Sequence, residues 1–164
     1  MQEAWMRSGA PNEHHARLLE LVGVWDARAT FWMGPDEPPI SSDGECVNEG
    51  ILGGRWLSMR YACDFMGMPY EGTGVMGFDT IAGEYVSNWL DSMCTQMMVH
   101  RGKPGADARR IEMSGSAVDP MGVEATTRHV TTIHSADRHT YEMFRAPRGQ
   151  PEFRSGIIEY TRRT

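Results

Sequence analysis

The chain has 164 residues, of which 40% are hydrophobic and 23% are charged, and its formal net charge is −6 at pH 7. This length predicts one domain spanning residues 1–164, with enough buried surface to fold without disulfides or a structural metal. The negative charge argues against a nucleic-acid partner, because contacts to phosphates need a basic face.

The chain also lacks the marks of a membrane or secreted protein. No apolar run approaches the roughly eighteen residues that a membrane-spanning helix needs, and the N-terminal segment has no apolar signal core. Cys46, Cys63 and Cys94 are odd in number and widely spaced, which is typical of free thiols. We therefore expect a cytoplasmic protein with no membrane partner.

One helix is predicted near the N-terminus, over about residues 12–22. Asn12 is a good N-cap, and Gly23 is a natural stop. An apolar stripe runs between them, formed by Leu18, Leu19, Leu21 and Val22. The pattern predicts a helix that packs one face against the rest of the domain.

The rest of the chain, about residues 23–163, predicts strands separated by short clusters of Gly, Pro, Asp and Ser. The expected strands are 24–33, 44–52, 55–66, 70–79, 84–92, 95–101, 108–118, 123–134, 138–146 and 153–162. Helices do not alternate with the strands, so the fold class is all-β. About ten antiparallel strands predict a closed barrel with room inside for a ligand.

Strand 55–66 illustrates the expected alternation. One of its faces carries Leu57, Met59, Tyr61, Cys63 and Phe65, and the other is more polar. A core that draws on such faces is predicted to bury Trp25, Leu57, Tyr61, Phe78, Trp89 and Ile158.

A resemblance to known families supports the barrel. The helix followed by Gly23-Val24-Trp25 resembles the Gly-x-Trp opening of the calycin barrels, the lipocalins and fatty-acid-binding proteins. Further segments resemble the DUF1579 family of uncharacterised proteins: "GAPNEHHARLLELVGVWD", "ILGGRWL", "YEGTGVMGFD", "WLDSM" and "EYTRR". The resemblance implies a lipocalin-like barrel in which Trp25 closes one end, and it supplies no reaction.

The segment "SNWLDSMCTQMMVH", residues 87–100, combines residue types that bind soft metals, catalyse reactions or line apolar pockets. Met97 and Met98 are adjacent and point to opposite faces of a strand, so they cannot both bind one ion. Methionine also fills irregular apolar space and adapts to ligands. We therefore interpret the segment as a pocket wall, and we expect no metal and no cofactor.

Asp91 is the candidate catalytic residue, because it shares a strand face with Trp89. A carboxyl group against an aromatic ring in a closed cavity would have a raised pKa and could transfer protons. Alternatively, the Asp91 side chain caps the turn that follows it. Both interpretations remain open from the sequence.

Four histidines form two further candidates. A hairpin turn at 136–137 would place His134 and His139 on one face, where they could hold a metal or gate a cavity, although no third ligand is evident. A haem-binding barrel of the nitrobindin type would need an interior histidine, for which His100 and His129 are the candidates. Haem is the lowest of the alternatives.

Tyr160 and Arg162 share a face of the last strand, so they could anchor an anion inside the barrel or be solvated at its rim. The leading hypothesis is that the barrel binds a small apolar or amphipathic molecule. The alternatives are an acid–base enzyme of the isomerase or cyclase type that uses Asp91, and an interaction module; a homodimer is also possible. The expected ligand-binding residues are Trp89, Asp91, Met59, Met76, Met97, Tyr61, Tyr160 and Arg162.

Overall fold

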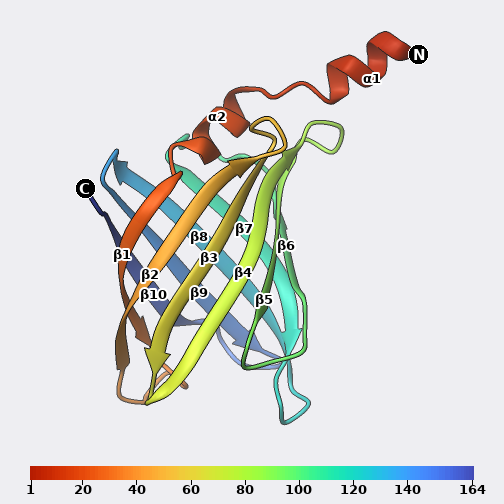
Figure 1. Ribbon diagram of the computed structural model, residues 1–164. Helices are drawn as coiled ribbons and strands as arrows, with labels where there is room; N and C mark the ends of the chain where they lie inside the picture. Colours follow the sequence, from red (N-terminus) through yellow and green to blue (C-terminus); the bar gives the residue numbers. More distant parts are fainter.

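The computed structural model describes residues 1–164 as two short helices followed by a closed barrel of ten antiparallel strands (Figure 1). The elements are α1 (Gln2–Ser8), α2 (Glu13–Leu19), β1 (Gly23–Phe31), β2 (Ile40–Ile51), β3 (Trp56–Phe65), β4 (Met68–Asp79), β5 (Glu84–Asp91), β6 (Met98–Gly102), β7 (Arg110–Val118), β8 (Glu124–Ser135), β9 (Arg138–Pro147) and β10 (Phe153–Arg162). Each strand pairs with the next, and β1 pairs with β10. The expected all-β barrel of about ten strands is confirmed.

The register of the closing pair fixes which side chains face inward. Trp25 lies opposite Arg162, and Ala27 lies opposite Tyr160. Trp25, Ala27 and Ala29 are buried while the residues between them are more exposed, as expected for a strand with one face on the core. The same alternation on β3 turns Leu57, Met59 and Tyr61 inward, as predicted.

Helix α2 covers one end of the barrel, at the top of Figure 1, and it is shorter than the predicted helix over 12–22. It ends at Leu19 because the chain then turns to bury Leu21 in the barrel end. There the Leu21 carbonyl accepts a hydrogen bond from Trp25 Nε1 at 2.9 Å. Helix α1 was not predicted; it extends away from the barrel, with Trp5 73% exposed.

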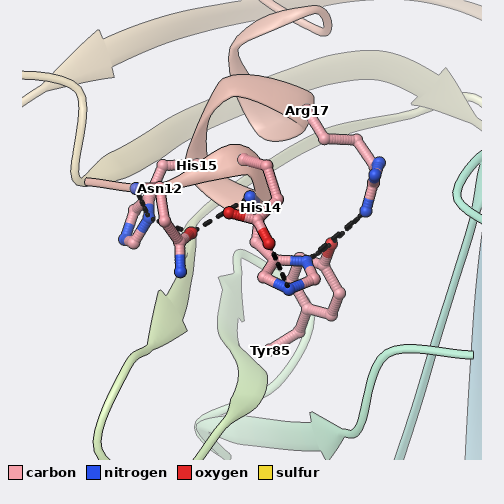
Figure 2. A network of polar contacts seen from close by, with 6 residues as sticks. Asn12, His14, His15, Arg17 and Tyr85 are labelled. Carbon is pink, nitrogen blue, oxygen red and sulfur yellow. Dashed lines mark hydrogen bonds and ion pairs between the residues drawn. The ribbon is translucent and has the colours of Figure 1, made fainter.

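A network of side chains holds α2 in place (Figure 2). The Asn12 side chain accepts a hydrogen bond from the His14 backbone, and His15 Nδ1 accepts one from the Asn12 backbone, which forms a capping box. His14 Nδ1 and Arg17 both contact the Tyr85 hydroxyl of β5, at 2.9 and 3.0 Å. These contacts dock the helix on the barrel.

A hydrophobic core fills the barrel beneath α2. It consists of Leu18, Leu21, Leu57, Met76, Tyr85, Ile111, Met113 and Ile133. Of the residues predicted to be buried, Trp25, Leu57, Tyr61 and Ile158 are. Phe78 and Trp89 are partly buried. Phe78 stacks on His14 near the barrel end, and Trp89 packs against a second buried cluster that contains Trp25 and Tyr61.

The opposite end of the barrel, here called the mouth, is bounded by residues 32–39, 66–67, 92–97, 119–123 and 148–152. Six methionines surround it, each between 47% and 87% exposed: Met33, Met66, Met68, Met93, Met97 and Met121. They come from four different connections, with Met68 at the adjoining start of β4. We call this set the methionine rim. Separately, none of the helices is long and apolar enough to span a membrane.

Candidate functional site

Four tyrosines on four strands converge inside the barrel. Their strand positions face inward on β3, β4, β9 and β10, and we call Tyr61, Tyr70, Tyr141 and Tyr160 the tyrosine cluster. The rings of Tyr61 and Tyr70 are 6.0 Å apart. Tyr160 lies in a buried group with Tyr61 and Trp25, against which Tyr70, Tyr141 and Trp89 pack.

Glycines on β4 make room for the indole of Trp89. Gly72 and Gly74 both face inward, opposite Asp91 and Trp89 of β5. A Cβ atom at Gly72 would lie only 2.2 Å from the Trp89 ring, so no larger residue allows this close approach. The alternating glycines of "EGTGVMGFD" therefore let the indole lie flat against the barrel wall.

His129 and Tyr141 are inward-facing residues that keep some accessible surface. Both lie deep among the strands, where protein surrounds them, and yet each keeps part of its surface accessible. Such surface faces a space within the barrel. Ala27 and Ala29 contribute little side-chain volume on the inward face of β1.

Most polar atoms around this space are paired. Trp89 Nε1 donates to the Tyr70 hydroxyl at 3.1 Å, and the Tyr141 hydroxyl bonds His129 Nδ1. His100 Nε2 bonds the Thr127 hydroxyl at 2.8 Å. The hydroxyls of Tyr61 and Ser42 are buried without a partner, as is His139 Nδ1 near Trp25.

Burial keeps these side chains uncharged at neutral pH. It raises the pKa of Tyr70 to about 12 and raises the pKa of Tyr61, Tyr141 and Tyr160 as well. Burial, with the neighbouring His100, lowers the pKa of His129 to about 3. The interior therefore offers neutral hydroxyl and imidazole groups between apolar rings.

His100 and His129, the suggested haem ligands, both face this interior. Their rings stack on each other with centroids 3.9 Å apart. Each also makes one hydrogen bond, to Thr127 and Tyr141 respectively. In this structure the two rings serve as part of the polar lining of the barrel.

Asp91 lies at the mouth, next to the tyrosine cluster, and its carboxylate caps the following turn. One carboxylate oxygen accepts hydrogen bonds from the backbone of Met93 and Cys94, at 2.9 and 3.0 Å. Trp89 and Asp91 do share the inward face, as predicted. Of the two interpretations, the turn cap is the contact that the structure contains.

The predicted methionines divide among three places. Met76 is buried in the core under α2, and Met59 packs against that core from β3. Met97 is 57% exposed in the methionine rim. The inward position opposite Trp89 belongs to Met98, the first residue of β6, and Met97 lies just before the strand.

The predicted anion anchor of Tyr160 and Arg162 is not formed. Arg162 donates to the backbone carbonyls of Glu20, Val22 and Ala136, and its guanidinium lies 4.2 Å over the Trp25 ring. Through these contacts Arg162 helps to close the barrel end under α2. Tyr160 remains in the interior without it.

The predicted pairing of His134 with His139 is wrong. The hairpin register shifts between Ile133 and Ser135, so His139 lies opposite Ile133 and faces inward. His134 is exposed and bonds the Thr140 hydroxyl. With this register Tyr141 lies opposite Thr131, and Met143 lies opposite His129.

Three residues of the site were not predicted: Tyr70, Tyr141 and Ser42. A signal for Tyr70 was present, because strict alternation from Tyr70 through Gly72 to Met76 places it on the inward face. Tyr141 follows from His139 in the same way once the hairpin register is known. Ser42 lies outside the predicted strand 44–52, in the longer β2.

Comparison with known proteins identifies the chain. The family described as "Protein of unknown function (DUF1579)" matches residues 10–162. The chain belongs to this family. The description of this family names no activity, and no curated protein matches the chain.

Solved structures match this DUF1579 chain in fold. The structure described as "Crystal Structure of Rv2717c from M. tuberculosis" has a TM-score of 0.71 at 17% identity, covering 94% of this chain and 100% of the other. A redesigned β-barrel has a TM-score of 0.45 at 12% identity, covering 90% of this chain and 96% of the other. At 17% identity the likeness to the first structure concerns the fold alone. The second match is too weak to support a conclusion about this chain.

Proposed function

We propose that this DUF1579 barrel binds a small, neutral, flat molecule of mixed apolar and polar character in the space bordered by the tyrosine cluster. The observation that carries the proposal is the accessible surface of His129 and Tyr141 deep inside the barrel. Enclosed sites with mostly aromatic walls and a few convergent polar groups are typical of small-molecule binding.

The electrostatics of the wall favour a neutral ligand. Burial holds the pKa of His129 at about 3 and that of Tyr70 at about 12, so neither is charged at pH 7. Arg145 is inward-facing at the mouth, where Asp119 pairs with it at 2.8 Å. An anionic group transferred into this interior would lose its hydration without meeting a free cation, and the Asp91 carboxylate at the mouth is already bound by the backbone of the following turn.

The shapes of the lining residues favour a flat ligand. Trp89 lies against the glycines of β4, and the rings of Tyr61, Tyr70 and Tyr141 come from other parts of the wall. Aromatic walls of this kind stack on planar molecules and contact their edges. The methionine rim would supply adaptable apolar contacts as the ligand passes the mouth.

An alternative hollow on the outer surface suits this ligand class less well. A space of about 480 Å³ lies beside the connection between β6 and β7. Its wall is polar, with a single hydrophobic side chain, Ala106, among charged neighbours that include Arg101 and Glu112. It lacks the aromatic surface that the interior provides.

The first test measures binding of the neutral dye Nile red, followed by dye fluorescence and by quenching of tryptophan emission. We expect saturable binding of one dye per chain. Met143→Trp should weaken it at least tenfold, because Met143 lies opposite His129 inside the barrel and a larger ring would fill the space. Glu142→Gln, its outward neighbour, is the control and should bind as the unaltered chain does.

Equal binding by Met143→Trp and the unaltered chain would place the dye on the outer surface and contradict the proposal, as would an absence of binding. Native mass spectrometry of freshly purified protein is an independent check. A retained neutral molecule would support the proposal. Retained haem, which carries two carboxylates, would instead support the haem alternative through His100 or His129.

A further inference from the structure

Two hydroxyl groups in the barrel wall are buried without a hydrogen-bond partner. They belong to Tyr61 on β3 and Ser42 on β2. Only 5% of the surface of Tyr61 is exposed. Buried hydroxyls are normally paired, because an unpaired one has lost water and gained nothing in return. This exception therefore needs an explanation.

The two hydroxyls belong to inward-facing residues of neighbouring strands. Ser42 and Gly44 share the inward face of β2, and Gly44 lies opposite Cys63, two residues beyond Tyr61. A Cβ atom at Gly44 would lie 2.8 Å from the Tyr61 hydroxyl oxygen, so the hydroxyl reaches across the bare backbone toward Ser42. Cys63 and Ser42 both lie close enough to the phenol to shift its pKa, which Cys63 raises and Ser42 lowers.

The other tyrosines make a useful contrast. The hydroxyl of Tyr70 accepts from Trp89 Nε1, and that of Tyr141 bonds His129. Their hydrogen-bonding capacity is therefore used at least in part within the wall. Neither the Tyr61 nor the Ser42 hydroxyl has such a partner within hydrogen-bond distance, and burial, the largest cause of the raised pKa of Tyr61, keeps its phenol protonated at neutral pH.

We propose that Tyr61 and Ser42 form a two-hydroxyl anchor for the carbonyl oxygen of the ligand. A carbonyl oxygen has two lone pairs and can accept one hydrogen bond from each hydroxyl. The ligand class is then a flat, neutral ketone, quinone or lactone. This inference rests on the proposed function, because it names the chemistry of the molecule that the interior binds.

The experiment compares fluorenone with fluorene, which have the same three-ring frame and differ at one carbon, C=O against CH₂. Two neutral hydrogen bonds correspond to a preference of at least about fivefold for the ketone in the dissociation constants of the unaltered chain. In the double variant Tyr61→Phe, Ser42→Ala the ratio of the two constants should fall to about one. Ser41→Ala, which makes the same change on the outward face of β2, should keep the preference.

Infrared spectroscopy of bound fluorenone gives a second readout that does not depend on affinity. The carbonyl stretch should shift to lower frequency in the unaltered chain and in Ser41→Ala, and return toward its value in hydrocarbon solvent in the double variant. If both molecules bind with equal affinity and the stretch does not shift, the anchor is wrong while the binding cavity stands. If neither molecule binds, both the anchor and the proposed function fail.

Discussion

At the scale of single residues, the tyrosine cluster allows a direct comparison between a paired and an unpaired phenol. Tyr61→Phe removes a buried hydroxyl with no partner, so it should raise the free energy of unfolding of the ligand-free protein by about 1 kcal/mol. Tyr70→Phe should lower it by about 1 kcal/mol, because Trp89 Nε1 then loses its acceptor. Urea unfolding of the two variants measures both changes.

The opposite signs make this test specific. Both substitutions delete one oxygen from an inward-facing tyrosine, so a general effect of hydrophobicity or packing would move both variants in the same direction. A loss of stability in Tyr61→Phe would show that its hydroxyl is already paired, and would also remove the basis of the two-hydroxyl anchor.

Asp91 shows at residue scale why the candidate site was only partly predictable. Its place on the inward face with Trp89 follows from strand alternation, and that part was correct. Which groups its carboxylate meets depends on the path of the turn after β5, where two backbone N–H groups point back at it. The sequence permits both a turn cap and a catalytic acid, and the contacts of the turn cap can be seen only in the folded turn.

At the scale of elements, α2 depends on its N-terminal cap. Asn12→Ala removes the side-chain acceptor of the His14 N–H and should cost about 1 kcal/mol. The loss should be concentrated in α2, so hydrogen exchange of residues 13–19 should accelerate while the barrel strands stay protected. Hydrogen exchange followed by mass spectrometry resolves the two regions.

Asn12→Asp is the matched control, because aspartate also caps helices and should retain most of the protection. Uniform acceleration throughout the barrel in Asn12→Ala would contradict local fraying. It would show instead that α2, held to β5 through the Tyr85 hydroxyl (Figure 2), unfolds only together with the strands.

The hairpin of β8 and β9 marks the limit of prediction for an element. The strand positions and the turn after Ser135 were predicted closely, but the register was not. A single irregularity between Ile133 and Ser135 moves His134 to the outside and separates it from His139. Because side chains alternate with period two, one extra residue reverses the face of every residue beyond it.

At the scale of the whole molecule, buried imidazoles should make stability depend on pH. Burial lowers the pKa of His129 and His139 from 6.5 to about 3. Between these values the unfolded chain binds a proton at each histidine and the folded barrel does not. The contribution of the two uncharged histidines to the free energy of unfolding is therefore complete above about pH 6.5, and it is lost progressively as the pH falls toward 3.

Two such groups should lower the free energy of unfolding by about 2–3 kcal/mol between pH 7.5 and pH 5.5, since each contributes up to about 1.4 kcal/mol per pH unit. Denaturant unfolding at several pH values measures this slope. His139→Gln should reduce this slope, whereas exposed His134→Gln should leave it unchanged. A flat profile across this range would mean that the interior histidines are protonated in the folded barrel.

The architecture as a whole was predictable to a greater extent than the site. Regular turn spacing indicates about ten antiparallel strands, and the closed barrel of ten strands agrees. The role of Arg162 was not predictable from its strand. Its three carbonyl partners belong to the segment after α2 and to the turn after β8, which only the closed barrel brings together.

The pairing of β1 with β10 also has a consequence for synthesis. Trp25 leaves the ribosome early, but its partner Arg162 is translated near the end of the barrel sequence, so the ring of strands cannot close until then. Until that moment β1 presents a free edge, and so does the last strand already formed. Such edges pair readily with other chains, and contacts this distant in sequence form slowly. A ribosome that stalls before β10 therefore holds an open sheet that is prone to aggregation.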